Sequence, residues 1–168
     1  MTPTTTTRML PIPADMLPLR VRADIRNTWL KRRLELILPE LMRRTAIDMW
    51  LVIAREYNED PVIMSLLPEP TMSARRRTIL MFTRRPNGSV ERMSIDRYGF
   101  AGFYEHGWDA DTSEGQYDCL ARMLRDRNPQ RIGLNISPTF AFGDGLSHTE
   151  YGQLATVLGP ELMARTVS

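Results

Sequence analysis

Few side chains in this sequence could hold a metal ion. There are two histidines, His106 and His148, and only His106 has carboxylates close by, at Asp109 and Asp111. An imidazole and two carboxylates at this spacing could form a weak metal site. A two-metal hydrolase needs several more convergent ligands, with its metals roughly 3.5 to 4 Å apart. We therefore favour a polar loop at 106–111, and we interpret His148 as an exposed residue in the first turn of a helix.

Patterns for nucleophilic catalysis and for phosphate binding are equally weak. Cys119, the single cysteine, lies beside Leu120 in a predicted helix, where a thiol usually packs as a small buried hydrophobe. No Gly-x-Ser-x-Gly motif is present, and Gly143-Asp144-Gly145 lacks the lysine and the further glycines of a phosphate-binding loop. A lone cysteine permits no internal disulfide, which fits a reducing, cytoplasmic compartment. We expect no catalytic residue, metal ion or cofactor in this chain.

The most distinctive polar segment is Arg55-Glu56-Tyr57-Asn58-Glu59-Asp60-Pro61. It follows a predicted buried strand, and binding crevices in open α/β sheets lie beyond the carboxyl ends of strands. Its guanidinium, carboxylates and phenol could bind a polar ligand or a partner subunit, or they could form an internal ion-pair network that organises the loop. Arg75 to Arg77 enter a neighbouring strand. Their outward-facing members could bind an anionic group or cover apolar surface with their stems.

The elements that position these residues begin with a helix predicted over residues 22–45. Lys31, Arg32 and Arg33 lie on its polar faces, and Pro39 should kink it or start a new turn, because proline supplies no backbone N–H. Apolar residues recur at helical spacing and predict a buried face. The residues of that face are Ile25, Trp29, Leu30, Leu34, Ile37, Leu38 and Leu41.

Strand and helix patterns alternate over the rest of the chain. The turn signal Asn87-Gly88 predicts a hairpin, and residues 62–67 predict a short helix. Ser113 and Ser147 each open a capping-box pattern, with Gln116 and Glu150 three residues later, and each predicts a helix start. Those two helices should end before Asn128-Pro129 and at Gly159-Pro160. Short apolar runs predict strands over residues 49–54, 77–82, 90–95, 131–136 and 162–167.

This order predicts a three-layer α/β/α architecture with a mixed sheet. The hairpin implies antiparallel pairing, and the later alternation of strand and helix implies parallel pairing. A length of 168 residues fits one domain, and 42% hydrophobic and 25% charged residues are ordinary for a globular protein. Residues 1–21 hold a threonine run and several prolines, and we interpret them as a mobile arm before a domain at 22–168. No apolar run approaches the ~18 residues that a membrane span needs.

Several strings, in order, resemble the N-terminal domain of the creatinase, prolidase and Xaa-Pro aminopeptidase family. The resemblance covers residues 22–168, and the Arg55–Pro61 string is specific to a bacterial peptidase-like branch. The strings run over residues 47–52, 55–61, 73–79, 131–135 and 142–147.

The resemblance implies a ribonuclease-H-like motif without ribonuclease activity. In this family the domain precedes a pita-bread catalytic domain, whose two Asp, one His and two Glu hold two divalent metal ions, Mn, Co or Zn. None of those ligand motifs occurs here, so the resemblance implies a non-catalytic domain, with its parent a dimetal Xaa-Pro aminopeptidase- or dipeptidase-like hydrolase. We expect a chain cut at the domain boundary rather than a stand-alone relative.

The family's N-terminal domain usually builds the dimer interface and reaches toward a neighbouring subunit's active site, restricting it to small substrates. By position, Arg55, Glu56, Tyr57 and Asn58 are the residues that the resemblance assigns to this role. The partners implied are the C-terminal catalytic domain and further copies of the chain, in a homodimer or a higher homo-oligomer, with no membrane.

Two alternatives remain. One is a stand-alone binding module, for nucleic acid, resting on the basic clusters Lys31–Arg33, Arg75–Arg77 and Arg84–Arg85. The formal net charge is only +2, the clusters occupy different elements, and no aromatic stacking motif is interleaved with them, so we interpret them as solvated faces and expect no nucleic-acid partner. The other is a small enzyme that uses the polar loop at 106–111.

Overall fold

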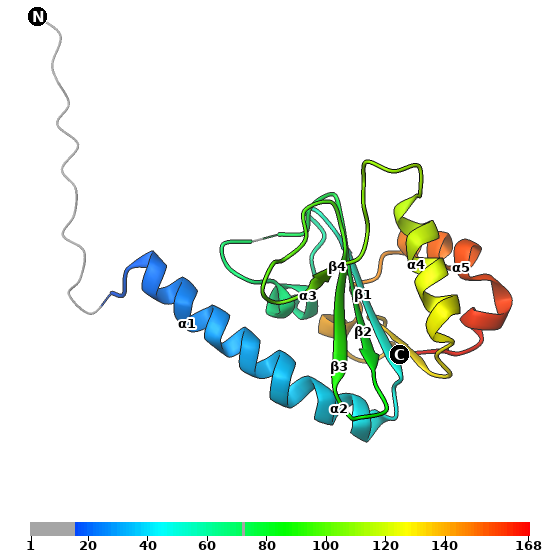
Figure 1. The fold of residues 1–168 in the computed structure, drawn as a ribbon, viewed down its shortest axis with the longest axis horizontal. Helices are drawn as coiled ribbons and strands as arrows, with labels where there is room; N and C mark the ends of the chain where they lie inside the picture. The colour runs from blue at the N-terminus through cyan, green and yellow to red at the C-terminus, as the bar shows by residue number, and fades with distance from the viewer. Residues whose placement is uncertain (1–15, 72) are drawn as a thin grey trace, which may run out of the picture.

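The computed structural model describes residues 16–71 and 73–168 and builds them around a six-stranded sheet (Figure 1). The strand order is β4-β3-β2-β1-β5-β6. Pairing is antiparallel between β1, β2 and β3 and parallel at the remaining positions, so the sheet is mixed as predicted. The strands are β1 (Met49–Arg55), β2 (Arg77–Arg84), β3 (Val90–Ile95), β4 (Glu105–His106), β5 (Ile132–Leu134) and β6 (Thr166–Val167).

Helices cover both faces of the sheet, which confirms the predicted α/β fold with three layers. Successive side chains of a strand point to opposite faces, so β1 contributes Leu51 and Ile53 to one core and Val52 and Ala54 to the other. The first core packs under α4 (Gln116–Arg127) and α5 (His148–Met163). The second packs under the helices of the N-terminal half, which are α1 (Leu19–Arg32), η1 (Arg33–Ile37), α2 (Leu38–Thr45) and α3 (Pro61–Leu66).

The predicted helix over 22–45 runs from Leu19 to Thr45 with one π-helical turn, η1, inside it. In that turn the N–H of Leu38 donates to the carbonyl of Arg33, five residues back. Pro39 follows directly, and a wider turn accommodates a residue that offers no N–H to the helical ladder. The expected kink is therefore a π turn, after which Pro39 lies in the first turn of α2.

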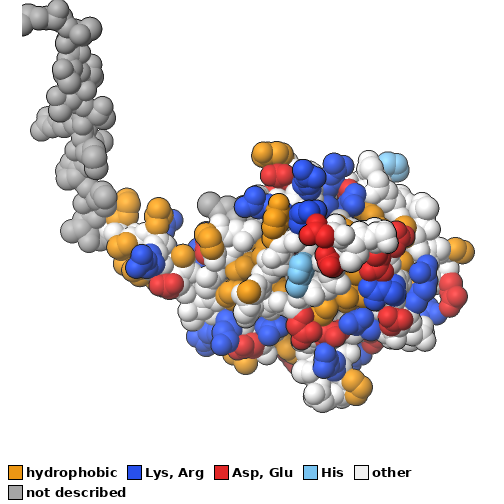
Figure 2. All heavy atoms as spheres, turned by 45° about the horizontal axis from the view of Figure 1, so that its top comes forward, with side chains coloured by type: hydrophobic (Ala, Val, Ile, Leu, Met, Phe, Trp, Pro, Cys, Tyr) orange, Lys and Arg blue, Asp and Glu red, His pale blue; other side chains and the backbone are white. Residues whose placement is uncertain are grey.

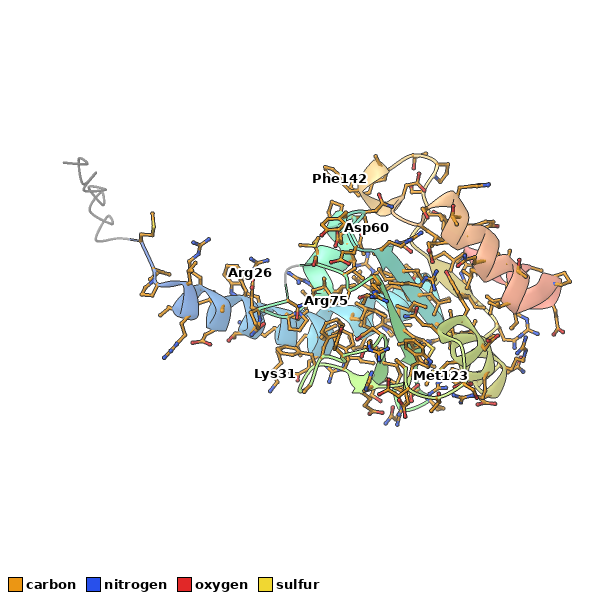
Figure 3. The ribbon with its side chains drawn as sticks, turned by 90° about the horizontal axis from the view of Figure 1, so that it is seen from above. Arg26, Lys31, Asp60, Arg75, Met123 and Phe142 are labelled. Atoms are coloured by element: carbon orange, nitrogen blue, oxygen red, sulfur yellow. The ribbon has the colours of Figure 1, made fainter. Side chains whose placement is uncertain are left out.

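The apolar face of this long helix differs from the prediction. Leu30, Leu34 and Leu38 are buried, together with Met42. Trp29 is 61% exposed, and Ile37 and Leu41 are about half exposed. Figure 3, seen from above, shows the start of α1 extending away from the sheet. The exposed residues of η1 and α2 alternate with residues that pack on the core, so the helix buries a narrower face than predicted. We call the exposed residues Trp29, Leu36, Ile37 and Leu41 the apolar stripe.

Other differences lie at element ends. Ser113 does not cap α4: its N-cap is Gly115, and no side chain accepts there. The helix expected to stop at Gly159 continues to Met163 after a kink at that residue, whose φ is +73°, so the last strand is only Thr166–Val167. Strand β4 was not predicted. Most of the predicted arm at 1–21 lies outside the described residues, and its end, Leu19–Val21, already belongs to α1.

Ser147 is confirmed as the N-cap of α5, since its hydroxyl oxygen accepts from the Glu150 N–H at 3.3 Å. The return bond of a capping box is replaced, because the Glu150 carboxylate accepts from Arg77 and Tyr117 instead. The hairpin around Asn87-Gly88 is confirmed as well, with β2 and β3 in antiparallel register. Within residues 16–71 and 73–168, every helix is too short or too polar to cross a bilayer.

A buried polar contact joins the loops that follow β1 and β5. Asp60 caps α3 by accepting from the Ile63 N–H at 2.8 Å, and its other oxygen accepts from the Asn135 amide at 2.7 Å. Asn135 also bonds the backbone N–H and carbonyl of Ile53 in β1. Gly145 packs against this group so closely that a Cβ there would lie 1.7 Å from the Asp60 carboxylate. The two loops are therefore held together by side chains that have little room to move.

We expect Gly145→Ala to lower the free energy of unfolding by about 2 kcal/mol, because the added methyl must displace a buried, hydrogen-bonded carboxylate. Gly152→Ala, in α5, is the matched control. A Cβ at Gly152 meets nothing within 4 Å, so this change should raise the free energy of unfolding by up to about 1 kcal/mol. Urea denaturation of the two variants measures both effects, and equal midpoints would contradict the packing argument.

Candidate functional site

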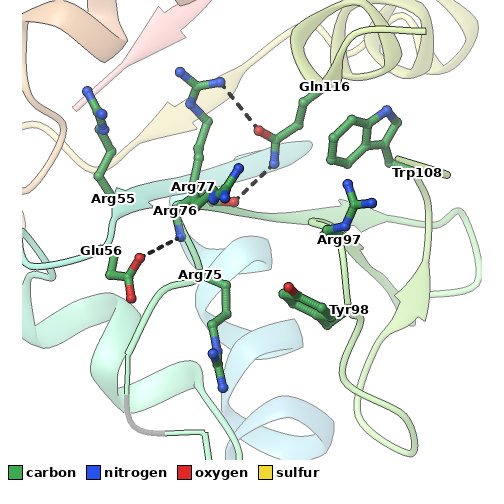
Figure 4. A pocket seen from close by; sticks show the side chains of 9 residues that line it. All are labelled: Arg55, Glu56, Arg75, Arg76, Arg77, Arg97, Tyr98, Trp108 and Gln116. Atoms are coloured by element: carbon green, nitrogen blue, oxygen red, sulfur yellow. Dashed lines mark hydrogen bonds between the residues drawn. The ribbon is translucent and has the colours of Figure 1, made fainter. Parts of the chain in front are cut away.

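A cleft of about 350 Å³ lies at the edge of the sheet where β1 and β3 end and β2 begins. Because β2 is antiparallel to both neighbours, residues distant in sequence meet at this edge. Figure 2, in which this edge comes toward the viewer, shows basic side chains gathered there. We call it the arginine cleft, since five arginines line it: Arg55, Arg75, Arg76, Arg77 and Arg97 (Figure 4).

Glu56 and Gln116 tie the walls of the arginine cleft to the sheet. Glu56 donates its N–H to the carbonyl of Arg76 at 3.1 Å, and its carboxylate accepts from the Arg76 N–H at 3.4 Å. Gln116, the first residue of α4, donates to the carbonyls of Arg77 and Ile95 and accepts from the Arg77 guanidinium at 3.3 Å. These bonds fix the backbone at the end of β3 and at the start of β2.

Two aromatic rings complete the lining. Tyr98 is exposed, and the guanidinium of Arg75 lies over its ring, 5.7 Å from the centroid. Trp108 is partly buried, and its indole N–H donates to the carbonyl of Glu114 at 2.8 Å. The arginine cleft therefore combines guanidinium groups with flat apolar surfaces.

Beside the cleft, the carboxylate of Glu150 is almost completely buried, with 1% of the residue exposed. Its Oε2 accepts from the Arg77 Nε at 2.6 Å and from the Tyr117 hydroxyl at 2.6 Å, and its Oε1 accepts from the Arg77 Nη2 at 3.2 Å. The Arg55 Nε lies 3.7 Å from the same Oε1. A buried carboxylate requires such partners, because water no longer solvates its charge. Glu150 thus joins β1, β2, α4 and α5 at one point.

Tyr117 is the neutral member of this group. Burial, reinforced by the hydrogen bond to the Glu150 carboxylate, raises the pKa of the Tyr117 phenol. The phenol therefore keeps its proton at neutral pH and donates it to Glu150. The Arg77 guanidinium also lies over the Tyr117 ring, 4.6 Å from the centroid. These contacts make Arg77 part of the scaffold of the arginine cleft.

Of the four residues predicted to contact a partner, two face outward. The N–H of Asn58 donates to the carbonyl of Arg55 at 3.0 Å and closes a tight turn. Tyr57, at its tip, has a φ of +68° and is 93% exposed. Asn58 is exposed as well, whereas Arg55 and Glu56 line the arginine cleft. We call Arg55–Asn58 the tyrosine turn.

The two alternatives for the Arg55–Pro61 segment apply to different residues. Three acids organise the loop: Glu56 bonds the backbone of Arg76, Glu59 accepts from the Ala74 N–H at 2.9 Å, and Asp60 caps α3. Tyr57 is left on the surface.

Sequence reasoning missed Arg97, Tyr98, Trp108 and Glu150 as members of this region. The rule that pointed to Arg55, polar residues just after a strand, also fits Arg97 and Tyr98 after β3.

The polar loop weighed as a metal site, with His106, Asp109 and Asp111, lines a second hollow that adjoins the arginine cleft. His106 bonds the carbonyl of Asp96 through Nε2 at 2.6 Å, and Asp111 pairs with Arg97 at 2.8 Å. Across residues 16–71 and 73–168, no three His, Cys, Asp or Glu side chains converge to hold a metal ion. Cys119 is fully buried, as predicted, and burial raises the pKa of its thiol to about 11. Its neutral thiol is a poor nucleophile at pH 7.

Comparison with known proteins gives a distant likeness of fold. No protein-family model matches the chain, and no curated protein matches it. Among solved structures, it is similar to an Xaa-Pro dipeptidase from Bacillus anthracis, with a TM-score of 0.44 and 14% sequence identity. The match covers 81% of this chain and 31% of the dipeptidase, so the chain spans about a third of that protein's length. At this identity and TM-score the likeness carries no information about activity.

We expect Glu150→Gln to lower the free energy of unfolding by about 3 kcal/mol, because it leaves the guanidinium of Arg77 half-buried without its counter-charge. Glu161→Gln is the control in the same helix. Glu161 also pairs with an arginine, Arg165, but its side chain is 83% exposed, and such pairs contribute about 0–1 kcal/mol. Chemical denaturation compares the two, and a Glu150→Gln variant as stable as the control would contradict the role given to this carboxylate.

Proposed function

We propose that this chain is the non-catalytic domain of an Xaa-Pro-peptidase-like metallohydrolase, in which it serves assembly and restricts access to a neighbouring subunit's active site. The observation that carries the proposal is the tyrosine turn. It presents a large aromatic side chain to solvent at the sheet edge, on a backbone that the surrounding contacts hold fixed. The sequence strings that resemble the family include this same turn.

The geometry of the tyrosine turn suits insertion into a partner. A non-glycine residue at positive φ costs on the order of 1–3 kcal/mol and persists where its surroundings over-determine it. Here the surroundings are the Arg55–Asn58 bridge and the Asp60–Asn135 contact below it. Exposed aromatic residues on fixed turns are frequent anchors in interfaces, because they bury much area and lose little conformational entropy. A pocket closed by Tyr57 would admit only small substrates.

The apolar stripe supports the assembly role. Its residues lie on η1 and on the two helices that flank it, α1 and α2, and all of them are about half exposed or more. Contiguous apolar surface of this kind is characteristic of protein–protein interfaces. We propose that a second copy of the chain, or the catalytic domain of the same protein, covers the apolar stripe in a homodimer or a higher homo-oligomer.

The remaining parts of the proposal follow from the family resemblance. The two divalent metal ions belong to a C-terminal catalytic domain, which is the partner of this one, and a cytoplasmic location fits the lone cysteine. A second candidate function is a stand-alone binding module. The arginine cleft is the observation that favours it.

The purified chain should not cleave Xaa-Pro dipeptides in the presence of Mn²⁺, Co²⁺ or Zn²⁺, because the resemblance assigns the metal ligands to another domain. Release of free proline measures cleavage, with an active Xaa-Pro dipeptidase as the positive control. Reproducible metal-dependent cleavage that co-purifies with the chain would overturn the non-catalytic role.

The chain should self-associate through the apolar stripe when no catalytic domain covers it. Light scattering after size exclusion should give a dimer or a larger species for the wild type, and Leu36→Glu with Ile37→Glu should reduce it to a monomer, because burying two carboxylates opposes association. Tyr151→Glu, at an exposed hydrophobic residue of α5 on the other face of the sheet, is the control. A monomeric wild type, or equal effects of both changes, would count against assembly by this surface.

A further inference from the structure

The arginine cleft carries more positive charge than its own acids neutralise. Within the described residues, Arg75 and Arg76 form no ion pair, and Arg55 has only the 3.7 Å contact with a carboxylate that Arg77 already holds at 2.6 Å. Figure 4 shows these side chains around one opening. Guanidinium groups gathered in a concave site repel one another and concentrate a positive potential inside it. A bound anion would relieve that repulsion.

The fifth arginine is available to a ligand as well. Arg97 pairs with Asp111 at 2.8 Å, but both side chains are more than half exposed. Such a pair contributes about 0–1 kcal/mol, so Arg97 can exchange Asp111 for an anion at little cost. Gln116 marks the N-terminus of α4 at the cleft wall, and this helix end has no side-chain cap. Its partial positive charge adds to that of the arginines, less the part that Asp118 in the first turn offsets.

The backbone of the arginine cleft is strained where the unpaired charges lie. Arg76 has a φ of +52°, a conformation that costs roughly 1–2 kcal/mol for a residue with a Cβ. The two backbone hydrogen bonds with Glu56 hold it there. As a result, the side chains of Arg75 and Arg76 leave the chain from a fixed turn, which reduces the entropy lost when they bind.

We propose that the arginine cleft binds a small organic oxyanion, a phosphate or a carboxylate group attached to a planar or apolar body. A guanidinium presents two parallel N–H donors that match the oxygens of either group. The rings of Tyr98 and Trp108 provide flat surfaces for the body of the ligand. A volume of about 350 Å³ lies within the range of small-molecule sites, about 300–1,000 Å³.

The arrangement of the basic residues favours a small ligand over a polynucleotide. Arg84 and Arg85 lie at the opposite end of β2, where they pair with Asp48 and Glu91. Lys31 lies on α1, in the layer that covers one face of the sheet. A polynucleotide requires a continuous basic track for successive phosphates. The five arginines of the arginine cleft instead surround one concave site, whereas other described arginines outside the ion pairs, such as Arg20, Arg44 and Arg125, lie on separate helices.

This proposal does not require the assembly and gating role, although Arg55 and Glu56 belong to both the arginine cleft and the tyrosine turn. The cleft would bind its ligand whether or not the chain belongs to a metallohydrolase, and Tyr57 and the apolar stripe keep their roles if it binds none. Failure of one proposal therefore leaves the other standing.

Titration of the ¹⁵N-labelled chain with phenyl phosphate and with benzoate tests the site. The sequence has three tryptophans, hence three indole N–H resonances, and of these only Trp108 lines the arginine cleft. At an ionic strength held constant with sodium chloride, we expect a saturable shift of the Trp108 resonance, while Trp29 and Trp50 stay in place. The anion that binds more tightly identifies the group as phosphate or carboxylate.

The double variant Arg75→Gln, Arg76→Gln should raise the Kd about tenfold or more, because it removes two charged donors. Arg20→Gln with Arg44→Gln removes the same charge from exposed positions on α1 and α2 and should leave the Kd unchanged. Arg97→Gln gives a second test if the first variant fails to fold. No saturable shift with either anion would overturn the proposal, as would equal losses in both double variants. Tighter binding of a thymidine oligonucleotide, weakened equally by both, would establish nucleic-acid binding instead.

Discussion

The architecture of the functional edge depends on one buried carboxylate. Glu150 cannot remain charged in the interior without donors, and the donors it uses come from different elements, Arg77 from β2 and Tyr117 from α4. The hydrogen bonds that the Glu150 carboxylate accepts connect α5 to α4 and to the start of β2. They also hold Arg77 in place, and Gln116 is fixed in turn by its bonds to the backbone and side chain of Arg77. The partners that the buried Glu150 carboxylate requires thus also position Arg77 and Gln116 in the wall of the arginine cleft.

Much of the fold could be predicted because its signals are local. The short apolar runs of β1 and β2, the Asn87-Gly88 turn and the Ser147 cap each depend on a few neighbouring residues, and each has the expected structure. The same kind of signal misled at Ser113, where the helix begins three residues later at Gln116. There the side chain of Gln116 bonds two strands rather than the helix end, because a long-range contact outweighs a local cap.

The candidate site could be predicted only where it is continuous in sequence. Arg55 and Arg77 lie at the ends of predicted strands, and polar residues at such positions indicated a binding site. The register that places these two side by side depends on sheet pairing. Trp108 reaches the same opening from a loop whose path no local pattern specifies. The apolar stripe was missed for a similar reason: helical spacing shows which residues share a face, but it cannot show how much of that face the rest of the domain covers.

The two outermost strands have a consequence for how the chain meets other chains. β4 and β6 are each only two residues long, so neither outermost strand itself presents more than a few free backbone groups. Long open rims invite edge-to-edge joining and fibrous aggregation, and very short outer strands prevent it. The chain can therefore expose the apolar stripe to a specific partner while its outermost strands offer little backbone for edge-to-edge pairing.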